Sequence, residues 1–246
     1  MKADPQAQQQ LLDLQSIDTT LQQLAHRRSH LPELPELERL AGELAALQAD
    51  RRRTQERADS LDRDINRIER DVEQVRTRKE RDSARLAAGS GPARELEALQ
   101  HEIESLNRRQ SELEDAELEL MEQREQVQQE LDQLAQRLVA SEQELAATEI
   151  ARDRALADIA QQEQAQIESR KPLVAQLPAD LLALYERIRD DTGGLGAALL
   201  RAGRCGGCRL ELAGSERARI KAAPPDEVIR CDECRRILVR TAESGL

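Results

Sequence analysis

Apolar residues recur at alternating spacings of three and four positions over two long stretches of the chain. Eleven of fifteen such positions are apolar in residues 37–86, and eleven of fifteen again in residues 96–145. A repeat of about 3.5 residues is typical of a coiled-coil seam. The pattern therefore predicts two long helices, each with one apolar stripe. The polar exceptions are Arg51, Thr54, Lys79 and Asp82 in the first stretch and Gln110, Glu117, Arg124 and Ser141 in the second.

A turn is predicted at residues 89–92, where Gly89-Ser90-Gly91-Pro92 separates the two stretches. Glycine commonly ends a helix and proline commonly begins one. The expected fold is mainly α, a long antiparallel coiled-coil hairpin within one chain. A small C-terminal β region should follow, whose two Cys-x-x-Cys pairs, Cys205/Cys208 and Cys231/Cys234, predict a zinc ribbon. Arms of equal length would place Leu61 opposite Leu120, with no polar seam residue facing another.

The hairpin is expected to cover residues 1–172. Pro32 and Pro35 predict a kink near residues 31–36, because proline removes a backbone donor and crowds the preceding turn. Lys171-Pro172 is expected to end the second arm. A connector with a short helix should then cover residues 173–196, followed by the ribbon at residues 197–246.

Composition supports a coiled coil over a globular core. Charged residues make up 35% of the chain, and it has one Tyr but no Phe or Trp. Disorder is the alternative for an acidic, aromatic-poor chain, but the sustained repeat argues against it. The net charge of −11 is uneven: residues 181–246 have 12 basic and 10 acidic residues, and the rest has 25 and 38. No signal peptide or membrane-spanning stretch is visible, so the expected location is the cytoplasm, with no membrane partner.

The four cysteines form two Cys-x-x-Cys pairs, Cys205/Cys208 and Cys231/Cys234. Two such turns can present four thiolates to one ion, a set that suits zinc. Four protein ligands leave no open position, so one structural Zn²⁺ is predicted. A redox Cys-x-x-Cys would need an α/β context that the sequence lacks. No catalytic constellation or phosphate loop is visible, so neither an enzyme nor a small-molecule substrate is expected.

Basic residues gather around the predicted ribbon and are candidate contacts for nucleic acid or a partner. They could bind phosphates, or they could balance nearby acids and the zinc–thiolate centre. The ribbon has no aromatic residue on which bases could stack, which argues against base-specific reading. The hairpin tip is a second candidate docking site. The ribbon set is Arg204, Arg209, Arg217, Arg219, Lys221, Arg230, Arg235, Arg236 and Arg240, and the tip set is Lys79, Asp82, Gly89, Gly91 and Arg94.

The chain resembles a bacterial family of coiled-coil hairpin proteins with a C-terminal C4-type zinc ribbon. The matching segments are Arg94 to Ile103, Leu184-Tyr185-Glu186-Arg187-Ile188, and Cys231-Asp232-Glu233-Cys234 followed by Arg236-Ile237-Leu238. Arg235 departs from the pattern, since the family usually has glycine there, and strain is expected in that turn. The resemblance implies the hairpin, the ribbon and the four zinc ligands.

Among the members that this chain resembles, some bind the enhancer-dependent sigma factor and a flagellin message, and others are linked to secretion. The 33 Arg against 4 Lys indicate a GC-rich genome, whose host need not have those partners. The resemblance therefore implies no named partner. The leading expectation is a non-enzymatic adaptor or scaffold that docks protein partners, in transcriptional or secretion and motility regulation. The alternative is a DNA- or RNA-binding regulator that acts through the basic ribbon.

Overall fold

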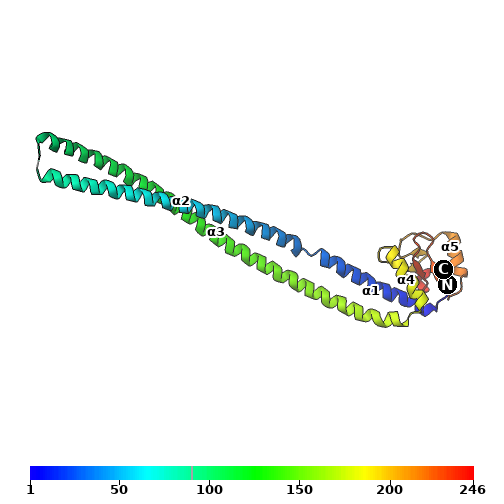
Figure 1. The fold of residues 1–246 in the computed structure, drawn as a ribbon. Coiled ribbons are helices and arrows are strands. Elements are labelled where there is room, and N and C mark those ends of the chain that lie inside the picture. The colour runs from blue at the N-terminus through cyan, green and yellow to red at the C-terminus, as the bar shows by residue number, and fades with distance from the viewer. Residues whose placement is uncertain (90) are drawn as a thin grey trace. The chain divides into compact units, whose positions relative to one another are not determined.

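The computed structural model describes residues 1–89 and 91–246, so the centre of the predicted turn, Ser90, lies outside the described residues. Helices dominate the chain (Figure 1). The elements in order are α1 (Pro5–Ser29), α2 (Glu33–Ala87), α3 (Ala93–Gln176), α4 (Ala179–Asp191), β1 (Ala197–Arg201), β2 (Arg204–Cys205), α5 (Gly214–Ala222), β3 (Ile229–Arg230), β4 (Ile237–Val239) and the 3₁₀ helix η1 (Ala242–Ser244).

These elements form two compact units. We call Pro35–Glu149 the arm unit, and Met1–Leu34 with Ile150–Leu246 the head unit. The arm unit contains most of α2 and the first two thirds of α3, paired antiparallel. The head unit contains α1, the end of α3, α4 and the ribbon. In the described part of the chain, no helix combines the length and the apolar character that a bilayer span needs.

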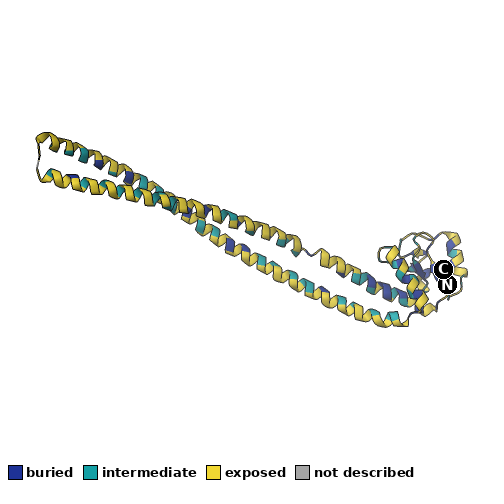
Figure 2. Cartoon of the chain, viewed as in Figure 1, coloured by how far each residue is buried: buried dark blue, intermediate teal, exposed yellow. Residues whose placement is uncertain are grey.

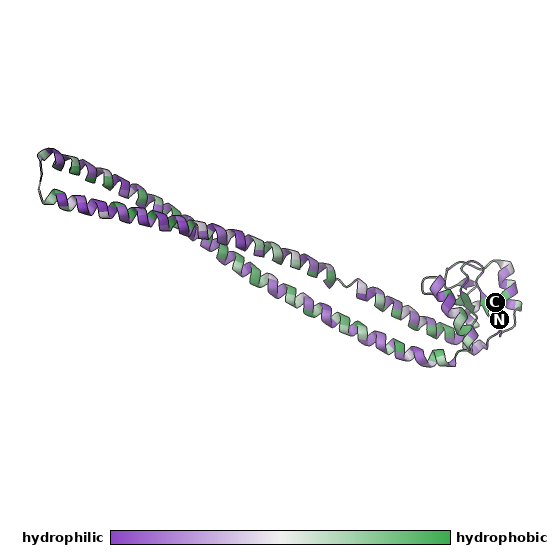
Figure 3. Ribbon diagram, in the orientation of Figure 1, coloured by the Kyte–Doolittle hydropathy of each residue, from purple (hydrophilic) through white to green (hydrophobic). Residues whose placement is uncertain are grey.

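The predicted seam is the buried face of the arm unit. Every seam position from 37 to 86 is buried or half-buried except Arg51, and every one from 96 to 145 is so without exception. Figures 2 and 3 show the same division, with buried and hydrophobic positions following one stripe and exposed, hydrophilic positions the rest. Gly89 has φ 62 and its N–H bonds to the carbonyl of Leu86, so it ends α2 as a left-handed cap.

Contacts across the arms differ from the equal-arm prediction. Leu61 borders a groove with Gln123, Gln126 and Val127, several positions beyond Leu120. Each helical side chain leans toward the N-terminus of its own helix, so side chains of α2 lean away from the turn and side chains of α3 lean toward it. A residue of α2 therefore meets residues of α3 that lie further from the turn than equal arms would place them. The expectation that no polar seam residue faces another is also wrong, because Lys79 Nζ donates to Gln110 Oε1 at 2.7 Å.

The prolines at the start of α2 and near the end of α3 affect their helices differently. The break between α1 and α2 lies at residues 30–32, and Pro35 lies in the first turn of α2, where its missing N–H costs no helical bond. Contrary to the prediction, α3 does not end at Pro172 but continues to Gln176. Leu173 and Val174 pack against the head core, and this burial holds the last turn despite one lost hydrogen bond.

The head unit is built around a four-stranded sheet in the order β2-β1-β4-β3. β1 runs parallel to β4, while β2 and β3 are antiparallel to their neighbours. One core contains side chains of α1, α4, β1 and β4, including Leu11, Leu14 and Tyr185. A second core contains Leu200, Ile220 of α5 and the buried cysteines.

The helix α5 and its place in the second core were not predicted. Residues 209–212, which follow the first cysteine pair, make only one bridge among the described residues, between Glu211 and Arg204. α5 follows directly, and its buried Glu216 accepts a hydrogen bond from the backbone N–H of Asp232 at 3.1 Å. The ribbon therefore shares its core with α1, α4 and α5 and is not an appended module.

Candidate metal centre and the surfaces around it

The two Cys-x-x-Cys pairs lie on two turns with the same backbone hydrogen bonds. The N–H of Arg209 donates to the carbonyl of Cys205 at 2.8 Å, and that of Arg235 to the carbonyl of Cys231 at 2.9 Å. Each first cysteine N–H then donates to the carbonyl five residues on, at 3.0 Å in both turns. These turns aim both sulfurs of each pair into one space.

The sulfur positions fit a single zinc ion. All four Sγ atoms lie within 4.8 Å of one another, with 3.7 Å between Cys205 and Cys234 and 3.9 Å between Cys208 and Cys231. Four sulfurs at tetrahedral corners, each about 2.3 Å from a zinc ion, would lie about 3.8 Å apart. The donor set and spacing together make this a C4 centre for one structural Zn²⁺.

Metal binding at this centre is coupled to the release of protons from the cysteine thiols. Burial raises the pKa of the Cys205 and Cys231 thiols above the ordinary value. Burial acts the same way on Cys234, but hydrogen bonds from the backbone and side chain of Arg236 and from the other thiols lower its pKa to about 7. Because zinc binds thiolates, loading the site releases protons, and the affinity for zinc must fall as pH decreases.

Arginine follows each pair at a position that favours glycine. Arg209 has φ 64 and Arg235 has φ 65, both in the left-handed region. This backbone conformation costs about 1–2 kcal/mol for a residue with a Cβ. The strain predicted at Arg235 is therefore present, and an equal strain exists at Arg209.

The nine candidate basic residues of the ribbon fall into three groups. Three pair with acids: Arg204 and Arg217 with Glu211, and Arg219 with Asp232. Three donate to backbone carbonyls, among them Arg240, which contacts five carbonyls between residues 220 and 227 at 2.6–3.3 Å. Within the described ranges, the side chains of Arg209, Lys221 and Arg235 have no partner, so these three remain free to bind a ligand.

The tip candidates are only partly accessible. Asp82 is 5% exposed and lies 3.8–3.9 Å from three arginines of its own helix, so it is a buried seam residue that a partner cannot reach. Lys79 is engaged with Gln110. Gly89, Gly91 and Arg94 are exposed.

Sequence reasoning missed a buried ionic cluster in the head unit. Asp18 of α1 accepts hydrogen bonds from Arg170 Nε at 2.7 Å, Arg189 Nη1 at 2.8 Å and the hydroxyl of Tyr185 at 2.7 Å. Glu186 of α4 pairs with both arginines. The cluster joins α1, α3 and α4. Its only trace in the sequence is the Leu184–Ile188 segment that carries the family resemblance.

Burial and hydrogen bonding oppose one another at Asp18. Burial by itself raises the pKa of this carboxyl, but the hydrogen bonds from Arg170, Tyr185 and Arg189 outweigh it and hold the pKa below its ordinary value. Asp18 is therefore ionised at neutral pH. In the cluster, two arginines pair with two carboxylates, so the charges balance. This arrangement fits a structural role, in which the cluster holds α1, α3 and α4 together.

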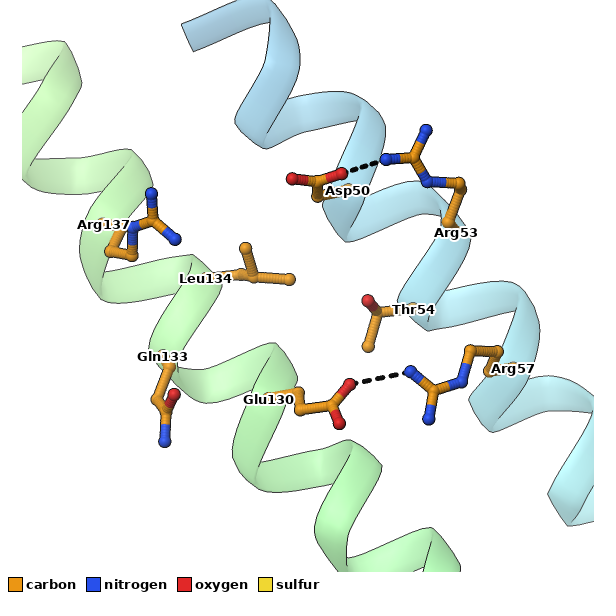
Figure 4. A pocket seen from close by; sticks show the side chains of 8 residues that line it. All are labelled: Asp50, Arg53, Thr54, Arg57, Glu130, Gln133, Leu134 and Arg137. Carbon is orange, nitrogen blue, oxygen red and sulfur yellow. Dashed lines mark hydrogen bonds and ion pairs between the residues drawn. The ribbon is translucent and has the colours of Figure 1, made fainter. Parts of the chain in front are cut away.

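The arm unit has a hollow of about 440 Å³ beside the polar seam residue Thr54 (Figure 4). Its rim contains Arg53, which pairs with Asp50, and Arg57, which pairs with Glu130 across the arms. The hollow is an open groove where a small polar residue replaces a leucine in the seam. Its charged groups are mostly paired with one another.

Known families and known proteins match nearly the whole length of the chain. Residues 14–193 match the CT398-like coiled coil hairpin domain, and residues 204–238 match the C4-type zinc ribbon domain. An uncharacterized protein of Mycobacterium tuberculosis is 41% identical over 240 residues, 98% of each chain. A solved Mycobacterium smegmatis structure is 35% identical with a TM-score of 0.85, covering 98% of this chain and 100% of that one.

The structure of CT398 from Chlamydia trachomatis shares the fold. It has a TM-score of 0.66 at 19% identity, covering 95% of this chain and 97% of that one. The likeness extends over both the helical hairpin and the cysteine-bearing region. The chain therefore belongs to the CT398-like coiled-coil hairpin family and carries a C4-type zinc ribbon.

Proposed function

We propose that this protein is a non-enzymatic adaptor that binds one protein through its arm unit and another through its zinc-stabilised head. The observation that carries the proposal is the long outer surface of α2 and α3, which remains exposed in the arm unit after the seam is buried. The zinc centre uses four protein ligands, so the metal holds the fold rather than a substrate. The adaptor contributes binding surfaces and no catalytic step.

The biological setting follows from chemistry and from resemblance. Four free thiols placed close enough to share one metal ion suit a reducing compartment, so we place the adaptor in the cytoplasm. Relatives that the sequence resembles act in transcription, motility and secretion, and we propose a regulatory role of that kind. The exposed tip residues Gly89, Gly91 and Arg94 are one proposed docking point.

The test is capture of partners from the native host with the intact, zinc-loaded protein. Deleting the ribbon is not a clean control, because its core is shared with α1 and α4. Point variants serve instead: Cys231→Ser for the head and Arg94→Glu for the tip. The adaptor proposal expects reproducible protein partners whose binding is lost in one variant and kept in the other. Failure to retain any protein at physiological salt would refute it.

Nucleic-acid binding through the ribbon is the second candidate function. The favouring observation is that Arg209, Lys221 and Arg235 are exposed and have no partner in the part of the chain that the structure describes. Contacts from these groups would be to phosphates, since the ribbon has no aromatic residue.

Binding to mixed-sequence DNA or RNA should then weaken steeply with salt. Each lost phosphate contact should reduce the log–log slope by about 0.7–0.9. Glycine is the suitable replacement at Arg209 and Arg235, because it fits their positive φ, and the acid-paired Arg217→Ala is the matched control. Salt-insensitive or sequence-selective binding would contradict the phosphate interpretation, and no binding at low salt would leave the adaptor alone.

A further inference from the structure

The outer face of α3 in the arm unit carries a row of large apolar side chains that nothing in the described chain covers. Leu118 is 59% exposed, Met121 is 50% exposed and Val139 is 53% exposed. Leu118 and Met121 are one turn apart, and Val139 follows Met121 by five full turns at about 3.6 residues per turn. All three lie away from the seam residues Leu120 and Val127, which pack against α2.

Single exposed apolar residues are common on protein surfaces. This row differs because of the charges that surround it. From residue 110 to residue 136, α3 has nine acidic residues and one basic residue. That basic residue, Arg124, turns toward the seam and donates to Asp62 of α2 at 2.8 Å. Over residues 110–136 the outer face therefore has acids and apolar groups but no cation, and the next basic residue, Arg137, lines the hollow beside Thr54.

The other arm shows that this imbalance is not a general property of the coiled coil. Residues 50–76 of α2, a stretch of equal length, have eight acidic and eight basic residues. They form pairs along the helix, such as Arg67 with Asp64 and Arg53 with Asp50. On α3, the acids that flank the apolar row have no cationic partner among the described residues. These are Glu114, Asp115, Glu122, Glu125 and Asp132.

We propose that this face, defined by Leu118, Met121 and Val139 with their flanking acids, binds a basic amphipathic helix of a protein partner. The inference rests on the proposed adaptor function and specifies its arm-side partner. A helix with apolar residues at spacings of three and four would cover the row, and its Lys and Arg residues would meet the uncompensated carboxylates. The same charge repels nucleic acid and anionic membranes. The evenly charged α2 of a second copy offers no matching basic face.

The experiment uses intact, zinc-loaded protein and a synthetic amphipathic helical peptide of about 20 residues, with leucines on one face and lysines on the other. A scrambled peptide of the same composition is the first control. Binding is measured by calorimetry at two salt concentrations. Two double variants test the face: Leu118→Gln with Met121→Gln, and Glu122→Lys with Glu125→Lys. The matched charge control is Glu69→Lys with Glu73→Lys, which makes the same charge change at exposed positions of α2.

We expect the amphipathic peptide to bind more tightly than the scrambled one, and each α3 variant to weaken it at least tenfold. The α2 control should weaken it less than threefold. Equal binding of both peptides would mean nonspecific charge attraction and would overturn the proposal. Equal losses in the α2 and α3 charge variants, or no binding, would do the same. If the protein self-associates, and the change of Leu118 and Met121 to Gln abolishes that self-association, the occupant of this face is a second copy of the chain. That result would also overturn the proposal. If the peptide does not bind but host partners are still captured, the adaptor function stands and only the assignment of this docking surface is refuted.

Discussion

Replacing Asp18 by Asn tests whether the buried ionic cluster fastens α1 to α3 and α4 in the head unit. The change keeps the size of the side chain and removes its charge. Oδ2 of Asp18 accepts from both Arg189 and Tyr185, whereas Oδ1 accepts from Arg170. An amide has only one acceptor oxygen, so its NH₂ group must face at least one guanidinium. The tyrosine hydroxyl can rotate and accept, but an arginine cannot.

The expected cost is about 3 kcal/mol in the free energy of unfolding at neutral pH. Removing one partner of a buried ion pair costs about 3–5 kcal/mol, because the remaining charge is left buried. The lower end applies here, since the side chains of Arg170 and Arg189 remain about a quarter exposed and keep some water. The matched control is Asp13→Asn on the same helix, where the carboxylate is exposed. It should change stability by less than about 0.5 kcal/mol.

Urea unfolding can be followed at the cluster itself. Tyr185 is the only aromatic side chain in the protein, so near-UV dichroism reports its environment alone. The pKa of Asp18 lies below its ordinary value, so its contribution is complete above the unfolded pKa of about 3.9 and is lost as pH falls through the folded pKa. The stability difference between wild type and Asp18→Asn should therefore be constant near neutral pH and shrink in strong acid.

Comparing the two proteins at each pH removes the separate effect of zinc loss in acid, because both carry the same four cysteines. If Asp18→Asn were as stable as wild type at neutral pH, the cluster would not fasten the head unit. A stability difference that persisted unchanged well below the ordinary carboxyl pKa would show that charge is not its source.

Three further predictions concern the zinc centre and the seam. Cys231→Ser should abolish stoichiometric zinc in metal analysis and melt the head unit, while far-UV dichroism shows the arm unit still helical; retained zinc would refute the assigned ligands. Arg235→Gly should stabilise the zinc-loaded protein by about 0.5–1 kcal/mol in urea, because glycine relieves the positive-φ strain but loses more entropy on folding, whereas Arg235→Ala should give no gain. Asp82→Leu should raise the melting temperature of the arm helices, since a buried carboxylate gives way to apolar packing; a lower melting temperature would show that its contacts with neighbouring arginines outweigh its burial.

The sequence alone determined the features that depend on local spacing. The repeat of three and four identified the seam on both arms, because burial of one helix face requires that period whatever its partner. Gly89 and Pro92 located the turn, and the two cysteine pairs identified the metal and its ligands, since a Cys-x-x-Cys turn brings its sulfurs together locally.

Tertiary structure alone decided what depends on neighbours distant in sequence. The pairing of Lys79 with Gln110 follows from the opposite directions in which the side chains of two antiparallel helices lean. The continuation of α3 through Pro172 follows from burial of Leu173 and Val174 in the head core. Asp18 shows the same limit most clearly. Within α1 it is one polar residue among many, and its partners Arg170 and Arg189 are about 150 or more residues away. Only the packing of three helices places them around one carboxylate, because the free energy of a buried charge depends on its surroundings and not on its sequence.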